Sequence, residues 1–237
     1  MAGRMKILNW WALAAKLETR EAWLQWAQQP ISDLSQDSPP PCVHIPMMSL
    51  RRMSVGTRLA VECGLTLLQQ HSADMAIFTS RHGELERTYK ILQHLDQDQP
   101  LSPTDFAMSV HNTAAGWLTI IAKNHLVTTS LAAGEDSFQQ GMIEAQGMLA
   151  SGSAERVLLV DFDGILPDVY HRFVSVTAQP YAVALLLEQG DEWQCEPVVG
   201  QATPGERPQS LTFLHGWLNG QSGFVVPGPR HDWRWTQ

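Results

Sequence analysis

The sequence has few cationic side chains. Only 16 Lys and Arg stand against 24 Asp and Glu among its 237 residues, which gives a formal net charge of −8. Attraction to nucleic acids and to anionic lipids depends on clusters of Lys and Arg. We therefore expect neither nucleic acid nor a membrane surface as a partner.

Long apolar runs are also missing. No uninterrupted run approaches the ~20 residues of a membrane-spanning helix, and no basic segment followed by an apolar one opens the chain as in a secretory signal. These two absences predict a cytoplasmic protein without membrane insertion.

Cysteine is scarce, and its spacing is uninformative. Cys42, Cys63 and Cys195 are widely separated, and none belongs to a CxxC pair. An odd number of isolated cysteines fits buried thiols in a reducing compartment better than disulfides or a zinc site. We expect neither a metal nor a cofactor.

The remaining composition is that of a globular chain. Hydrophobic residues make up 44% of it and charged residues 17%, which suffices for a substantial core without disulfides or metals. We predict one domain over residues 1–237, with a core of about 5–190 and a tail of about 191–237.

Apolar runs alternate with amphipathic segments along the chain. The pattern predicts strands at about 5–15, 74–80, 126–131, 156–161 and 181–187, and helices at about 50–70, 84–95, 109–123 and 135–150. This order favours an α/β domain with a mostly parallel sheet covered on both faces. The segment after Gly190 is richer in Pro, Gly and Gln, and we expect loops and short elements there.

Two acidic residues end one of these runs. Residues 157–166, VLLVDFDGIL, have the form of the nucleophile motif of haloacid-dehalogenase-type phosphohydrolases, in which Asp161 would attack phosphorus and Asp163 would act as acid and base with Mg²⁺. That chemistry needs a downstream cation and more acidic ligands, but no lysine follows Lys123 and the second Asp expected after Asp191 is missing. We prefer to interpret both as turn-forming residues at the end of a strand, and the phosphohydrolase stays an alternative.

A second motif spans residues 112–137, NTAAGWLTIIAKNHLVTTSLAAGEDS. It resembles the helix, strand and nucleophile turn of β-ketoacyl synthases, and the resemblance continues without a gap from Asn112 to Glu135. In that family a cysteine at this turn holds the acyl chain as a thioester. Here the position is Glu135, which cannot form a thioester. The alternative for Glu135 is an acidic residue that favours the start of a helix.

The resemblance extends over about residues 5–190. In this region the chain is similar to the short ketosynthase-like proteins of aryl polyene and related type II systems. Its motifs are SRHGELERT (80–88), SVHNTAAG (109–116) and AAGEDSF (132–138). It implies a thiolase-like ketosynthase fold with a single N-terminal-type βαβαβαββ half and a short irregular C-terminal extension. The second half of a complete ketosynthase supplies two catalytic histidines and a lysine. We expect His171, His215 and His231 to be structural or exposed instead.

The resemblance implies a function without catalysis by this chain itself. It would be a chain-length-factor-like subunit that pairs with a catalytic ketosynthase in a heterodimer. The pair would elongate acyl or polyene chains on acyl carrier protein in aryl polyene, fatty acid or polyketide biosynthesis. A third possibility is a stand-alone acyl-binding or scaffolding module.

The resemblance also implies two sets of contact residues. The strand before the nucleophile turn would pair across the subunit interface, and its lack of charge suits a covered edge; its residues are Val127, Thr128, Thr129, Ser130 and Leu131. The segment leading into the 109–123 helix would bound the acyl tunnel through Phe106, Met108, Thr113 and Trp117.

Overall fold

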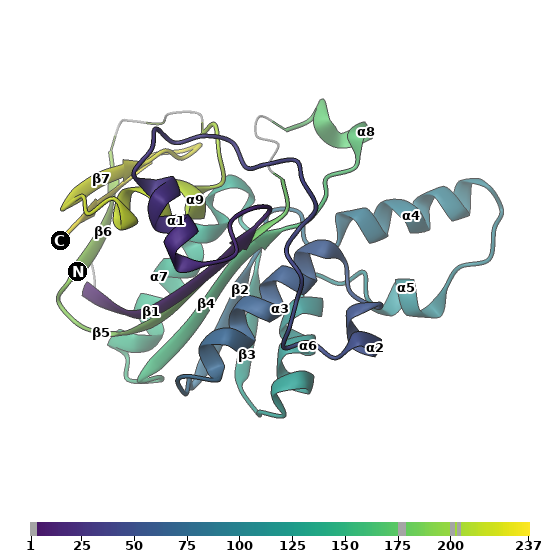
Figure 1. Ribbon diagram of the computed structural model, residues 1–237, viewed down its shortest axis with the longest axis horizontal. Helices are drawn as coiled ribbons and strands as arrows, with labels where there is room; N and C mark the ends of the chain where they lie inside the picture. The colour runs from purple at the N-terminus through teal and green to yellow at the C-terminus, as the bar shows by residue number, and fades with distance from the viewer. Residues whose placement is uncertain (1–3, 175–178, 200–201, 203–204) are drawn as a thin grey trace.

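An eight-stranded sheet crosses the molecule in the order β3-β2-β4-β5-β1-β6-β8-β7 (Figure 1). The computed structural model describes residues 4–174, 179–199, 202 and 205–237. The strands are β1 (Arg4–Ala14), β2 (Met75–Thr79), β3 (Val127–Leu131), β4 (Arg156–Asp163), β5 (Tyr181–Gln189), β6 (Trp193–Val198), β7 (Gly223–Val226) and β8 (Asp232–Thr236). The helices are α1 (Arg20–Ala27), α2 (Met47–Leu50), α3 (Val55–Leu68), α4 (Leu85–Asp96), α5 (Pro103–Ala107), α6 (Thr113–Ala122), α7 (Ser137–Ala150), α8 (Asp168–His171) and α9 (Gln209–Leu218), and a 3₁₀ turn, η1 (Gly134–Asp136), precedes α7.

The sheet is not mostly parallel, and that expectation was wrong. Only β2–β3 and β2–β4 pair in parallel, whereas β5, β1, β6, β8 and β7 pair with their neighbours in antiparallel fashion. The apolar runs were found correctly, but strand direction depends on the connections. Parallel neighbours need a covering crossover. Among the described residues of the connection from β4 to β5, the only helix is the single turn α8.

The segment after Gly190 is more regular than expected. It adds three strands and α9 to the fold. The chain passes from one edge of β1 to the other, because Met5 pairs with Gln189 on one side and with Trp193 on the other. The short strand DWRWT buries Trp233 and Trp235 on either side of the exposed Arg234, and it also buries Asp232. Its polar residues and the surrounding Pro and Gly hid this pattern in the sequence.

Two hydrophobic cores lie on opposite faces of the sheet, which follows from the alternation of side chains along a strand. Leu159 of β4 and Leu185 of β5 join one core with residues of α1, α7 and α9, including Trp23 and Phe213. Their neighbours, such as Leu158, join the other core with residues of α3 and α6. β5 is therefore apolar along almost its whole length, as a strand covered on both faces must be.

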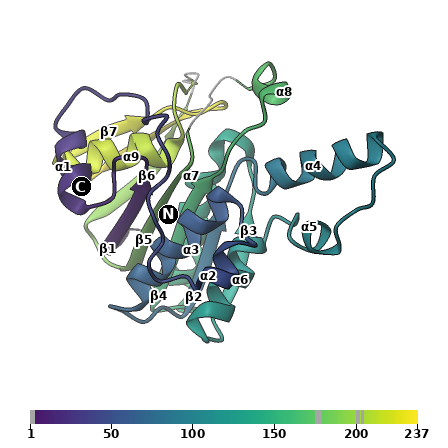
Figure 2. The same cartoon turned by 45° about the vertical axis from the view of Figure 1, so that its right-hand side comes forward.

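Two helices leave this compact body. α4 and α5 project to one side, at the right of Figures 1 and 2, and neither contains a buried residue. Within the described part of the chain, none of the helices has the length and apolarity needed to cross a membrane.

Candidate functional site

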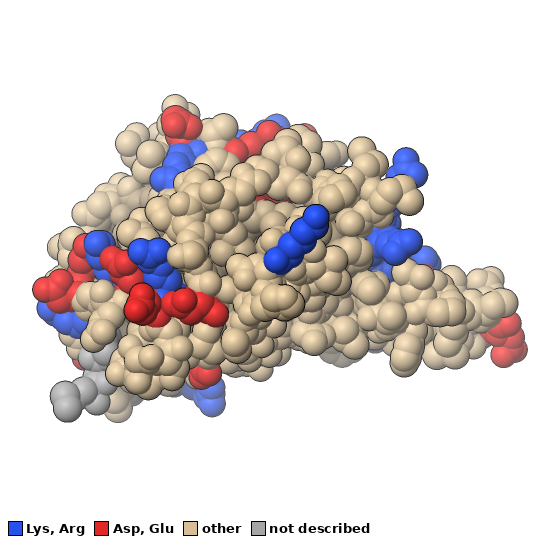
Figure 3. Space-filling view, turned by 90° about the horizontal axis from the view of Figure 1, so that it is seen from below, with Lys and Arg blue, Asp and Glu red and all other residues tan. Residues whose placement is uncertain are grey.

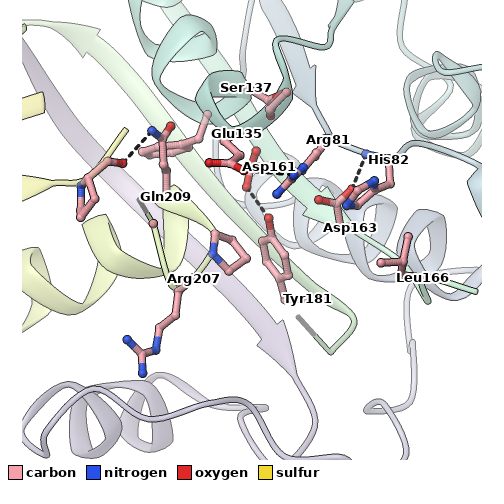
Figure 4. A pocket seen from close by; sticks show the side chains of 16 residues that line it. Arg81, His82, Glu135, Ser137, Asp161, Asp163, Leu166, Tyr181, Arg207 and Gln209 are labelled. Carbon is pink, nitrogen blue, oxygen red and sulfur yellow. Dashed lines mark hydrogen bonds and ion pairs between the residues drawn. The ribbon is translucent and has the colours of Figure 1, made fainter. Parts of the chain in front are cut away.

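The candidate site lies where β2, β3 and β4 end. Thr79 of β2 is in register with both Leu131 of β3 and Asp161 of β4. The residues that follow these three strands therefore meet beyond the carboxyl ends of the strands. Ligand sites commonly form at the carboxyl ends of parallel strands. The pocket there has a volume of about 50 Å³, and Figure 4 shows the side chains that line it.

Glu135 lies in the turn between β3 and α7. Gly134 precedes it with φ of +64°, a left-handed conformation that glycine adopts without strain, and the turn brings Glu135 to the start of α7. There its carboxylate forms an ion pair with Arg81, at 3.1 Å between Oε1 and Nη2. Glu135 is thus held by the guanidinium of Arg81, in the loop after β2, and its position at the start of a helix also favours its negative charge.

Asp161 is surrounded by hydroxyl groups. Its Oδ1 accepts a hydrogen bond from Thr79 (2.5 Å), and its Oδ2 accepts hydrogen bonds from Tyr181 (2.9 Å) and Ser210 (2.6 Å). Burial, and to a lesser extent the nearby charge of Asp163, raise the pKa of Asp161 to about 6, although the three hydrogen bonds favour the ionised form.

Asp163 fixes the loop that follows β2. Its Oδ1 accepts hydrogen bonds from the Ser80 hydroxyl (2.6 Å) and the His82 backbone N–H (2.9 Å), and burial raises its pKa. The imidazole of His82 is neutral near pH 7, because burial and then the charge of Arg81 lower its pKa to about 4. The loop carrying Arg81 is therefore anchored beside Glu135.

These contacts give no support to a phosphohydrolase. Asp161 is only 3% exposed, and both of its oxygens already accept hydrogen bonds from hydroxyls. Among the described residues, no group of three or more His, Cys, Asp or Glu could hold a metal ion. Asp163 accepts a backbone N–H at a strand end, as the turn interpretation expects, whereas Asp161 is bound only by side-chain hydroxyls.

The three cysteines do not line the pocket. Burial raises the pKa of Cys42 to about 12, and it also raises the pKa values of Cys63 and Cys195. None of them offers the thiolate that nucleophilic catalysis requires.

The C-terminal segment contributes to this site, which its sequence did not indicate. Asp136, next to Glu135, is fully buried, and its Oδ1 accepts hydrogen bonds from Gln209 Nε2 (2.9 Å) and Trp233 Nε1 (3.1 Å). Arg230 Nε lies 3.6 Å from its other oxygen. No sequence signal connects residues so far apart; the only hint was an acidic pair at the start of a helix.

The four residues expected to bound the acyl tunnel fall into two groups. Phe106 lies in α5 and is 67% exposed. Trp117 of α6 is buried in the hydrophobic core between the sheet and α3, and Met108 packs against that core. The Thr113 hydroxyl donates to the backbone oxygens of Met108 and Val110. Only Phe106 presents most of its side chain at the surface.

The strand expected at the subunit interface is β3, an edge strand of the sheet. Figure 2 shows it beside α6. Val127 at its start is 60% exposed, and its described backbone pairing is to β2 alone.

The three C-terminal histidines lie outside the pocket. His171 and His215 contact backbone oxygens of Leu166 and Gln29 through Nε2, and His231 packs against the ring of Trp233.

A family model supplies the identity of the fold. The model of the β-ketoacyl synthase N-terminal domain matches residues 23–236. This chain belongs to the β-ketoacyl synthase family. The expected thiolase-like ketosynthase fold is thereby confirmed, and the family likeness reaches beyond residue 190 to the last strand.

Solved ketosynthase structures agree with this assignment. One chain of a ketosynthase, ApeO, in complex with its chain length factor, ApeC, from Xenorhabdus doucetiae is 47% identical; the match covers 98% of this chain and 99% of that one, with a TM-score of 0.93. The ishigamide ketosynthase/chain length factor is 15% identical, with a TM-score of 0.66 over 83% of this chain and 68% of that one. A β-ketoacyl synthase from Burkholderia phymatum is 14% identical, with a TM-score of 0.58 over 94% and 71%; at these identities the last two show the fold alone. A comparison with curated proteins finds no match.

Proposed function

We propose that this chain is a chain-length-factor-like subunit without catalytic activity of its own. It pairs with a catalytic β-ketoacyl synthase, and the heterodimer elongates acyl or polyene chains on acyl carrier protein. The products belong to aryl polyene, polyketide or fatty acid biosynthesis. The three cysteines form no disulfide, which is consistent with a protein that functions in the reducing cytoplasm.

The observation that carries the proposal is the ion pair between Glu135 and Arg81 at the start of α7. A ketosynthase needs a thiolate at this turn, where the helix start favours negative charge. Here a carboxylate fills the position and is neutralised by an arginine. Burial holds the thiols of Cys42, Cys63 and Cys195 protonated, so none of these three cysteines replaces the missing nucleophile.

The relatives support a role beside a catalytic partner. The 47% identical chain comes from a complex of a ketosynthase with its chain length factor. β3 suits such pairing, because an uncharged edge strand offers unpaired backbone groups to another chain.

A stand-alone acyl-binding module fits the pocket less well. A volume of about 50 Å³ beside Glu135 holds a few water molecules, but it is too small for an extended acyl chain. The acyl chain is therefore assigned to the partner subunit.

The test is coexpression with the ketosynthase encoded beside this chain. The complex is purified through a tag on this chain alone, and malonyl condensation on acyl carrier protein is assayed for wild type and Glu135→Ala. A stoichiometric complex whose turnover changes less than about twofold is expected. The matched control is Glu144→Ala, an exposed glutamate of α7, the helix that follows Glu135.

Two results would overturn the proposal. Loss of condensation in Glu135→Ala with the complex intact would mean that Glu135 takes part in chemistry. A lone chain that releases phosphate in the presence of Mg²⁺ would instead restore the role of Asp161 as a nucleophile.

A further inference from the structure

A groove separates α4 from the body of the protein, at the right of Figures 1 and 2. Its lining comes from the start of α3, from α4 and from the loop that leads to α8. Gly164 and Leu166 of that loop line the pocket beside Glu135, whereas Ile165 and Pro167 line the groove. The two cavities therefore lie on either side of one loop. With a volume of about 500 Å³, the groove is in the size range of ligand-binding clefts.

The groove has an excess of cationic side chains. Four cations and two carboxylates line it; they are Arg51, Arg58, Arg87, Lys90, Glu86 and Asp105. Four of the 16 Lys and Arg of an acidic chain thus gather in one place. In Figure 3 several blue side chains lie at the base of the part that projects to the right. Such a local cluster attracts anions even though the molecule is negative overall.

Two of the four cations are already neutralised. Asp105 of α5 binds Arg87 at 2.5 Å and Lys90 at 3.1 Å, both on α4. Although burial alone would raise it, the hydrogen bonds and charges of Lys90 and Arg87 lower the pKa of Asp105. Arg87 also donates to the backbone oxygen of Arg52 at 2.8 Å, which ties α4 to the residues before α3. The wall formed by α4 is therefore fixed before any ligand binds, and a fixed wall loses less conformational entropy on binding.

The other two cations have no carboxylate partner. Arg58 Nε donates to the backbone oxygens of Leu50 (3.0 Å) and Met53 (3.1 Å), which fixes the plane of the guanidinium. In the part of the chain that the structure describes, neither Nη atom of Arg58 nor the exposed side chain of Arg51 has a hydrogen bond or ion pair. Glu86 is close enough for Arg58 to oppose the rise in its pKa that burial causes, but the two form no ion pair there. Arg58 and Arg51 thus keep donors for a ligand.

The rest of the lining is mainly apolar or aromatic. Val55 of α3 and Ile165 face the same groove as Arg58. Tyr89 of α4 also lines it, and its ring packs edge to face against Tyr170 of α8, with 5.7 Å between ring centroids. A ligand that fills the groove therefore has an anionic group and an apolar or aromatic group.

We propose that this groove binds an organic phosphate, whose phosphate contacts Arg51 and Arg58 and whose remaining part lies against Tyr89, Val55 and Ile165. Guanidinium groups match the geometry of phosphate oxygens and bind them through paired hydrogen bonds. A free phosphorylated metabolite and a phosphate-linked prosthetic group on a carrier protein present this same chemistry. The site belongs to this chain alone, so the inference stands apart from the proposed function.

The test is isothermal titration of the purified protein with coenzyme A, a phosphate ester with an aromatic and an extended part, and with pantetheine, which lacks the phosphates. We expect coenzyme A to bind and pantetheine not to bind. Arg51→Glu and Arg58→Gln should each weaken binding about tenfold, because each removes charge-assisted hydrogen bonds. Arg234→Gln, an exposed arginine of β8 outside the groove, is the matched control and should bind as wild type does.

Arg51→Glu keeps the test valid if Arg58→Gln disturbs folding, because the Arg51 side chain is exposed and the melting temperature should stay unchanged. Failure of wild type to bind coenzyme A overturns the inference. So does binding by Arg51→Glu within about twofold of wild type, or equal binding of pantetheine.

A second titration, with a carrier protein, distinguishes the two sources of the phosphate. Binding of the carrier only when it bears its prosthetic group supports the tethered phosphate. Binding of coenzyme A without binding of either carrier form supports a free metabolite. Neither result depends on a ketosynthase partner, so the proposed function stands or fails separately.

Discussion

Asp161 shows how strongly surroundings alter a single side chain. Its neighbours in sequence suggest a phosphoryl-transfer nucleophile. Its neighbours in space are three hydroxyl groups that donate hydrogen bonds to both carboxylate oxygens. Ser210 comes from α9 and Thr79 from β2, so the carboxylate joins three parts of the chain. Its role in the structure is therefore to hold these elements together.

The raised pKa of Asp161 predicts a pH-dependent stability. Because the pKa is about 6 in the folded protein against an ordinary value of 3.8, the folded state binds the proton more tightly than the unfolded state. The resulting stabilisation is present below about pH 4 and is lost as the pH rises through about 6, by about 2 to 3 kcal/mol in total.

Denaturant unfolding between pH 4 and pH 7 measures this change. Wild type should lose stability with rising pH relative to Asp161→Asn, which cannot ionise. Asp191→Asn, at an exposed position, should follow the wild-type curve. Parallel curves for wild type and Asp161→Asn would contradict the assignment.

Substitution of Phe106 should change the chain length of the product. If its ring bounds the partner's acyl tunnel, Phe106→Ala should let the complex make longer chains, because removing a large side chain opens space at the tunnel end. Mass spectrometry of the carrier-bound products measures their length. Phe173→Ala removes an equally exposed ring, at 68%, and should leave the length unchanged; equal product lengths for both variants would remove Phe106 from the tunnel.

At the scale of elements, α7 lies close against the sheet. A Cβ atom on Gly141 would lie 2.5 Å from Thr79 Cγ2 and 2.9 Å from Leu159 Cδ1, whereas a Cβ atom on Gly147 of the same helix would meet nothing within 4 Å. The helix therefore contains one glycine that its packing requires and one that it does not.

This contrast predicts opposite effects from the same substitution. Gly141→Ala should lower the free energy of unfolding by about 1 to 3 kcal/mol through overpacking. Gly147→Ala should raise it by about 0.5 to 1 kcal/mol, because alanine favours a helix interior. Denaturant unfolding of the two variants measures the difference, and equal changes of the same sign would contradict the close approach of α7.

The elements also show where sequence patterns carry structural information. The apolar runs located β2 and β5, and the amphipathic spacing located α4 and α7, each to within a few residues. Strand direction could not be read in the same way, since the side-chain period of a strand is two whichever way it runs. α4 was likewise predicted as a helix, but its separation from the body of the protein depends on which residues find partners in space.

At the scale of the whole molecule, the C-terminal segment is part of the core. Trp235 of β8 has no exposed surface and packs against Phe213 of α9, with 4.6 Å between ring centroids. Asp136 binds Gln209 and Trp233 from the same segment. The C-terminal segment therefore stabilises the turn that carries Glu135, through the hydrogen bonds of Asp136 in that turn.

Trp235→Ala tests this integration. It should lower the free energy of unfolding by about 3 to 5 kcal/mol, as for other large aromatic side chains removed from a core. Arg234→Ala changes an exposed neighbour and should have a small effect. Similar small changes for both variants, measured by thermal or denaturant unfolding, would mean that the segment is a dispensable extension.

The sequence by itself determined the α/β class, most of the helices and strands, and the family, because these depend on local periodicity and on motifs read along the chain. It also placed Glu135 at the turn before a helix. Only the tertiary structure decided that Arg81 pairs with Glu135, that three hydroxyls enclose Asp161 and that residues 205–237 support the site. The physical reason is that ion pairs, hydrogen bonds and burial depend on distances in space. Residues as far apart in the sequence as Arg81 and Glu135, or Thr79 and Asp161, come into contact only when the sheet and its helices have formed.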